Sequence, residues 1–177
     1  MKKLQHEEIL EQKPSVDEVR DKKRTPFYAL LDNVRSLHNV GAIFRTSDAL
    51  LLEKLYLCGI TGTPPRKEIT KTALGAEEVV PWEHYDDAYE IIEKLKEDGV
   101  KIVAVEIAHG SVNYSEMKYD FPVCFVFGHE VYGISDDVME LVDYAIELPM
   151  LGRANSLNVA TCYGIIMYDA FTKFKSS

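Results

Sequence analysis

Short, mostly apolar runs alternate along this chain with longer stretches in which apolar residues recur at helical spacing. The strand-like runs lie at 27–34, 54–60, 100–107, 122–128 and 145–150. The helix-like stretches lie at 40–52, 67–74, 86–98, 134–143 and 156–174. Strands that are apolar on both faces are typical of a parallel sheet with helices on both sides. The sequence therefore predicts an α/β fold with a mostly parallel sheet.

The 177 residues fit one main domain preceded by an arm. Residues 1–24 are polar and interrupted by Pro14, which predicts one or two short surface helices, and residues 25–177 would form the domain. We expect no membrane span, because no apolar run reaches the roughly 18 residues that a membrane helix needs. The basic N-terminus has no apolar segment like that of a secretory signal. Three scattered cysteines predict a reducing, cytoplasmic location without disulfides.

The net charge of −9 counts against a general affinity for nucleic acids, since contacts to phosphate supply much of that affinity. The charge is uneven, however. Residues 1–45 hold nine Lys or Arg against seven Asp or Glu, whereas residues 46–177 hold 11 against 22. Taken alone, the basic run at 20–24 and the basic cluster at 66–71 are best explained as solvated surface.

Several familiar catalytic motifs are absent from the sequence. It contains no G-x-G-x-x-G dinucleotide fingerprint, no G-x-x-x-x-G-K-[ST] phosphate loop and no G-x-S-x-G nucleophile turn. The five histidines have no metal-ligand spacing among themselves or with the cysteines. We therefore expect neither a metal site nor a serine hydrolase.

Three polar, glycine-bearing segments follow predicted strands, at 35–45, 127–135 and 149–158. Ligands of parallel sheets bind beyond the carboxyl ends of the strands, so we expect the functional site there. Singly, each segment also has a plain structural explanation, such as a helix cap at Asn39. Residues 154–168 carry no charge, which indicates a helix covered on more than one face, for instance by a second subunit.

Together, these segments resemble the SpoU/TrmH branch of the SPOUT superfamily, whose members are RNA ribose methyltransferases. The chain contains N-x-G-x-x-x-R from Asn39, then F-G-x-E-x-x-G from Phe127, then P-M-x-G-x-x-x-S-L-N from Pro149. Each motif alone is weak, but the ordered set is specific and spans about residues 27–171. His129 stands where the family often has asparagine.

The resemblance implies a deep C-terminal trefoil knot and a homodimer whose active site draws on both subunits. It also implies S-adenosylmethionine as the cofactor, bound in the knot, and no metal. Carried over to this sequence, the adenosine of the cofactor would lie against Phe127, Gly128, Ile146, Leu148, Gly152 and Leu157. An apolar, glycine-containing slot suits an adenine ring that is hydrogen-bonded by the backbone.

The implied reaction moves a methyl group from the sulfonium to a ribose 2′-hydroxyl, with Arg45 at that hydroxyl. A guanidinium stays protonated at ordinary pH and is a poor base. We therefore expect Arg45 to stabilise the developing alkoxide and the adjacent phosphate. Four further residues would orient Arg45, cofactor and ribose through hydrogen bonds: Asn39, Glu130, Ser156 and Asn158.

Local positive charge would then supply the affinity for RNA, through Arg24, Arg35, Arg66 and Arg153. The short arm resembles the compact tRNA-acting members of the family more than the larger rRNA-acting ones, which favours tRNA as substrate. Two alternatives remain open. One is a methyltransferase of the same superfamily that acts on a base, and the other is a non-catalytic RNA-binding module.

Overall fold

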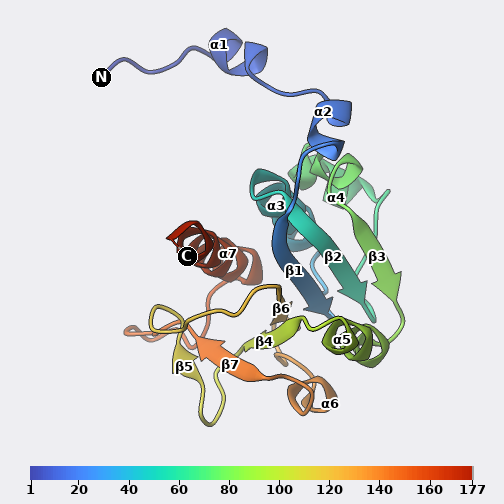
Figure 1. Ribbon diagram of the computed structural model, residues 1–177, viewed down its shortest axis with the longest axis vertical. Coiled ribbons are helices and arrows are strands. Elements are labelled where there is room, and N and C mark those ends of the chain that lie inside the picture. The colour runs from blue at the N-terminus through green and yellow to red at the C-terminus, as the bar shows by residue number, and fades with distance from the viewer. Residues whose placement is uncertain (177) are drawn as a thin grey trace.

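A computed structural model describes residues 1–176. The described residues form a seven-stranded sheet in the order β3-β2-β1-β6-β4-β7-β5 with helices on both faces (Figure 1). All of the paired strands are parallel, which confirms the predicted α/β class. The strands are β1 (Thr25–Asp32), β2 (Leu52–Cys58), β3 (Trp82–Tyr85), β4 (Lys101–Val105), β5 (Val112–Asn113), β6 (Val123–Phe127) and β7 (Tyr144–Glu147).

The helices lie close to their predicted positions. They are α1 (His6–Glu11), α2 (Val16–Arg20), α3 (Leu37–Ala49), α4 (Lys67–Ala73), α5 (Ala88–Glu97), α6 (Asp136–Met139) and α7 (Val159–Ser176), with a 3-10 turn, η1, at Ala76–Glu78. The sequence patterns did not predict β3 and β5. Both lie at the edges of the sheet, where a strand has only one neighbour and needs no continuous apolar run.

Side chains of the central strands alternate between two cores, one on each face of the sheet. In β1, Ala29 and Leu31 face α3, α4 and α7, whereas Leu30 faces α5 and α6. In β6, Phe125 belongs to the core beneath α3, α4 and α7, and Val126 belongs to the core beneath α5 and α6. Each central strand is thus buried on both sides, as its apolar sequence requires.

Helix α3 begins at its cap Ser36, three residues before Asn39. The Ser36 hydroxyl accepts from the Asn39 backbone N–H at 3.4 Å, so the alternative role of Asn39 as the cap is wrong. Gly41 lies against α4, where a Cβ atom would overlap Thr72 and the Ile69 carbonyl. Gly41, the glycine of the first motif, therefore allows α3 to pack closely on α4. The Asn39 side chain does not cap the helix and is free for other contacts.

Helix α7 packs on the same face of the sheet as α3. Its buried side chains include Tyr163 and Met167. The Tyr163 hydroxyl lies 2.6 Å from Ser47 Oγ of α3, and the Tyr163 ring lies 4.9 Å from that of Phe127, at the end of β6. These contacts fix the N-terminal half of α7 beside both α3 and the carboxyl end of β6.

The arm contains the two short surface helices that its polarity predicts. Helix α1 buries none of its residues and stands clear of the sheet in Figure 1. Helix α2 contacts the body through Val19 and through Arg20, whose guanidinium donates to the Glu78 carbonyl at 2.9 Å. Within residues 1–176, no helix has both the length and the apolar character needed to cross a bilayer.

Candidate functional site

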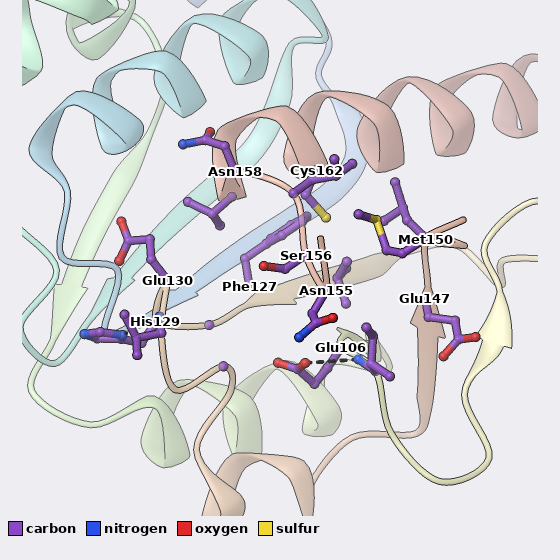
Figure 2. Close-up of a pocket in the computed structure, with 18 of the residues that line it drawn as sticks. Glu106, Phe127, His129, Glu130, Glu147, Met150, Asn155, Ser156, Asn158 and Cys162 are labelled. Carbon is purple, nitrogen blue, oxygen red and sulfur yellow. Dashed lines mark hydrogen bonds between the residues drawn. The ribbon is translucent and has the colours of Figure 1, made fainter. Parts of the chain in front are cut away.

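A cavity of about 410 Å³ opens where β4, β6 and β7 end. Its walls come from residues 105–107 at the end of β4, from 127–133 at the end of β6 and the loop after it, from 146–150 at the end of β7 and beyond, and from 155–159 at the start of α7 (Figure 2). The second and third segments singled out in the sequence therefore converge on one space, at the carboxyl edge where parallel sheets bind ligands.

The loop after β6 depends on its two glycines. A Cβ atom on Gly128 would overlap the backbone of Gly133 and Ile134, and Gly133 has a φ of 72°. The two backbone hydrogen bonds between His129 and Gly133, each 2.9 Å, close the loop on itself. Only residues without a Cβ permit so close an approach, so the spacing of the motif reflects a tight loop.

The side chain of His129, where the resemblance leads us to expect asparagine, stabilises this loop. Its Nδ1 atom accepts from the backbone N–H groups of Val131 at 3.0 Å and Tyr132 at 3.4 Å. An asparagine side chain commonly bonds the backbone two residues on in the same way. The imidazole therefore keeps the local turn.

The Glu130 carboxylate binds the first turn of α3. It accepts from the backbone N–H groups of Arg35 and Ser36, both at 3.0 Å, and from Asn39 Nδ2 at 2.9 Å. Partial burial raises the pKa of Glu130, but these hydrogen bonds outweigh the burial and hold the pKa below its ordinary value of 4.5. The carboxylate is thus ionised at neutral pH, beside the positive end of a helix.

The Asn158 side chain links α7 to this arrangement. Its Nδ2 donates to Asn39 Oδ1 at 3.0 Å, while its Oδ1 accepts from the backbone N–H groups of Ala160 and Thr161 at the start of α7. Three of the five predicted catalytic residues therefore form one hydrogen-bonded chain, Asn158–Asn39–Glu130. This chain holds α3, α7 and the loop after β6 in a fixed relation at one side of the cavity.

Ser156 is the fourth predicted catalytic residue, and it lines the cavity beside Asn155. Figure 2 shows both side chains within the cavity. The Ser156 hydroxyl makes no hydrogen bond with any residue between 1 and 176, so its donor and acceptor positions are available to a ligand.

Five of the six residues predicted to contact adenosine line this cavity: Phe127, Gly128, Ile146, Leu148 and Leu157. The side chains of the four residues other than Gly128 give the cavity an apolar wall. Gly152 lies outside the lining and is exposed, and a Cβ atom there would meet nothing within 4 Å. The prediction for Gly152 thus has no support from the cavity in one protomer.

Comparison with known proteins agrees with this geometry. Residues 26–168 match the sequence model of the SpoU rRNA Methylase family. The chain belongs to this family. It is 36% identical, over 155 residues, to the tRNA (guanosine(18)-2′-O)-methyltransferase of Aquifex aeolicus, with 86% of this chain and 72% of that protein covered.

Two solved structures of the family resemble the fold. The crystal structure of the A. aeolicus TrmH/SpoU tRNA modifying enzyme superposes with a TM-score of 0.82 at 32% identity, covering 96% of this chain and 84% of the other. The AdoMet-bound rRNA methyltransferase of Sinorhizobium meliloti gives a TM-score of 0.79 at 30% identity, covering 87% and 59%. The likeness thus includes the segments that form the cavity.

Arg45, the fifth predicted catalytic residue of this SpoU family member, does not line the cavity of its own protomer. It is exposed on α3, and its side chain makes no hydrogen bond or ion pair with a described residue. It lies six positions after Asn39, which places it about 9 Å further along the helix and about 120° around it. One protomer therefore does not bring Arg45 to the Glu130 network.

The four arginines predicted to bind RNA have different surroundings. The Arg24 guanidinium donates to the carbonyls of Leu52 at 3.0 Å and Val79 at 2.8 Å, and its partial burial lowers its pKa. It ties the start of β1 to neighbouring segments. The other three are exposed on loops or at a helix start, where a phosphate could reach them: Arg35, Arg66 and Arg153.

Sequence reasoning missed two charged residues that line the cavity, Glu106 and Glu147. Glu106 follows β4 directly, and Glu147 is the last residue of β7. An acid immediately after a buried strand, at the edge where ligands bind, is the signal that could have revealed Glu106. Within residues 1–176, no group of three or more His, Cys, Asp or Glu side chains could hold a metal ion.

Proposed function

We propose that this chain is an S-adenosylmethionine-dependent RNA methyltransferase that acts on a ribose 2′-hydroxyl, with tRNA as its substrate. The observation that carries the proposal is the chain Asn158–Asn39–Glu130 at the side of a cavity whose apolar wall suits adenosine. The names of the relatives support it, since one acts on the 2′-oxygen of a tRNA guanosine and another was solved with AdoMet.

The cavity has the size and chemistry that the cofactor needs. Its volume of about 410 Å³ lies within the usual range for small-molecule sites. Phe127, Ile146 and Leu157 offer apolar surface to an adenine ring, and Gly128 lines the cavity beside them. The bound cofactor supplies an activated methyl group, so the protein has mainly to align the reacting centres.

The protein side chains orient the substrate and stabilise charge. The 2′-oxygen gains negative charge as its proton passes to solvent water, and a guanidinium close to it lowers the energy of that state. We assign this role to Arg45, while Asn39 and Glu130 hold α3, the helix that carries it. The free hydroxyl of Ser156 is available to position cofactor or ribose inside the cavity.

A homodimer would complete this site. The outer face of α7 is uncharged near its start and presents Tyr168, which is half exposed, and Gly164, beside which a Cβ atom would meet nothing within 4 Å. A second copy packed on this face would bury it and could bring its Arg45 to the cavity of the first. Arg45 is exposed and lies outside its own cavity, which supports a site shared between subunits.

We further propose that the segments following β6 and β7 thread through one another as the trefoil knot of the family. Their convergence on one cavity, followed by the return of α7 onto α3, supports this path. We place the protein in the cytoplasm, where its RNA substrate occurs, in agreement with three free cysteines among the described residues.

Transfer of a labelled methyl group from S-adenosylmethionine to a tRNA transcript tests the proposed function. Alkali cleaves RNA through the 2′-hydroxyl, so a methylated ribose leaves an alkali-resistant dinucleotide whereas a methylated base does not. We expect the label in the resistant fraction. Label in alkali-sensitive nucleotides would instead identify a base methyltransferase, and absence of transfer with intact cofactor binding would favour a binding module.

Replacement of Arg45 tests its assignment. We expect Arg45→Ala to lower kcat for methyl transfer roughly 100- to 1000-fold, because the alkoxide loses its nearest positive charge, and Arg45→Lys to recover part of it. Arg66→Ala, which removes another exposed arginine, should raise KM for RNA and leave kcat nearly unchanged. Wild-type kcat for Arg45→Ala would refute the assignment.

A further inference from the structure

The Glu106 carboxylate is held in a fixed orientation at the cavity. Its Oε1 accepts from the Ile107 backbone N–H at 3.0 Å, and its Oε2 accepts from the Ile134 N–H at 3.1 Å. These donors come from different segments, one after β4 and one after β6. The carboxylate is thus positioned before any ligand arrives, and rigid positioning of this kind reduces the entropic cost of binding.

The loop after β6 is shaped to leave room for this carboxylate. A Cβ atom on Gly133 would overlap Glu106 Oε2, so the second glycine of the loop also clears the space for the acid. The charge of this carboxylate also affects Cys162, another residue that lines the cavity. Burial, and then the negative charge of Glu106, raise the pKa of the Cys162 thiol to about 12.

Each Glu106 oxygen has one further acceptor position beyond its backbone hydrogen bond. Figure 2 shows the carboxylate directed into the cavity, whereas the carboxylate of Glu147 points away from it. Glu147 accepts instead from the Ser111 hydroxyl. Glu106 therefore offers two adjacent, unused acceptor positions beside the apolar wall that contains Ile146.

Two adjacent acceptors fit two adjacent hydroxyl donors. A carboxylate beside an adenine slot, at the carboxyl edge of a parallel sheet, is the group that other nucleotide-binding folds use to hold ribose hydroxyls. We propose that Glu106 binds the 2′- and 3′-hydroxyls of the ribose in the cofactor and so selects a ribonucleoside. This inference rests on the proposed function, since it assumes that the cavity holds the adenosyl group.

Calorimetric titration of the full chain with three ligands tests the proposal: S-adenosylmethionine, S-adenosylhomocysteine and 5′-methylthioadenosine. The last has the ribose but neither the sulfonium nor the amino-acid group. We expect Glu106→Gln to weaken all three by the same factor, roughly 10- to 100-fold, because the two hydroxyls lose a charged acceptor. The control Glu116→Gln removes the same charge from an exposed position outside the cavity lining and should change affinity less than about 2-fold.

The 2′-deoxy form of 5′-methylthioadenosine isolates the contact. The wild type should bind this deoxy compound less tightly than 5′-methylthioadenosine. Glu106→Gln should bind the two compounds equally, because the 2′-hydroxyl contributes to affinity only through its contact with Glu106. Losses confined to the ligands with an amino-acid group would assign Glu106 to the ammonium instead and overturn the proposal. A loss confined to S-adenosylmethionine would assign it to the sulfonium, with the same consequence.

Two controls distinguish a general loss of structure from a loss of ribose binding. One is the melting temperature of each variant without ligand, and the other is Glu106→Asp, which keeps the negative charge on a shorter side chain. We expect Glu106→Asp to melt near the wild-type temperature and to lose affinity for all three ligands. Unchanged affinity in Glu106→Gln, with tight binding by the wild type, rejects the proposal and leaves the proposed function intact. Absence of cofactor binding by the wild type would reject both.

Discussion

At the scale of single residues, the site depends on the carboxylate of Glu130. Motif order alone predicts Asn39, Glu130 and Asn158 as one set, but it cannot predict which of them touch. The structure shows that Glu130 binds the N-terminal turn of α3 and the Asn39 amide, and that Asn158 extends this network to α7. Such contacts depend on the fold, because the residues are more than 90 positions apart.

The lowered pKa of Glu130 predicts a pH-dependent contribution to stability. Because the folded-state pKa lies below 4.5, the ionised carboxylate stabilises the fold above that pH and loses this effect as the pH falls through the folded-state value. Glu130→Gln should therefore lower the free energy of unfolding by about 1–3 kcal/mol at neutral pH. The difference from wild type should shrink steadily below pH 4.5.

Urea denaturation at pH 7 and at about pH 3.5 measures this difference. Glu116→Gln is the matched control, because Glu116 is exposed and its side chain has no hydrogen bond to residues 1–176. It should leave the free energy of unfolding unchanged at both pH values. A Glu130→Gln effect that stays constant across the two would contradict the assigned charge.

At the scale of elements, apolar runs predicted the central strands well because each is buried on both faces. Patterns were less informative for β3 and β5, whose edge positions relax that requirement. The start of α3 was placed too late, since the cap Ser36 lies within a polar segment that also resembled a binding loop. The glycines of the loop after β6 were recognised as significant, but the clash that each avoids became visible only in three dimensions.

Gly128→Ala tests the role of that loop. The added methyl group would overlap the backbone of Gly133 and Ile134, so the loop must shift. We expect a loss of about 1–3 kcal/mol in the free energy of unfolding, together with weaker cofactor binding. Thermal unfolding and calorimetry measure the two effects. Gly152→Ala is the control, because the added methyl group meets no atom within 4 Å. Its melting temperature should equal that of the wild type. Equal destabilisation of Gly128→Ala and Gly152→Ala would contradict the proposed role of the loop.

At the scale of the whole molecule, the path of the chain is what local patterns convey least. A knot is rare among folds and depends on the order in which distant segments pass one another, so only the family resemblance suggested it. The same holds for the second subunit. The uncharged stretch at 154–168 indicated a covered helix, and within residues 1–176 the face of α7 that bears Tyr168 remains exposed.

Tyr168→Glu tests the proposed dimer. A charge in the centre of an apolar interface would be buried without a partner, so we expect the variant to become monomeric and to lose methyl transfer. Tyr89→Glu is the control, because Tyr89 is 53% exposed, close to the 50% of Tyr168, and lies on α5 at the opposite face of the sheet. Light scattering gives the mass of each variant. If Tyr168→Glu remains a dimer, the interface between the subunits does not include this face of α7.

The most direct test of the account mixes two variants, Arg45→Ala and Ser156→Trp, whose indole would fill the cavity that Ser156 lines, and measures alkali-resistant methylated dinucleotide from tRNA. Each variant alone should be inactive. If Arg45 of one subunit completes the cavity of the other, each mixed dimer contains one intact site. Random exchange of equal amounts should then restore about a quarter of wild-type activity. If exchange is verified by mass and the mixture remains as inactive as its components, Arg45 does not act across the dimer and the proposed site is wrong.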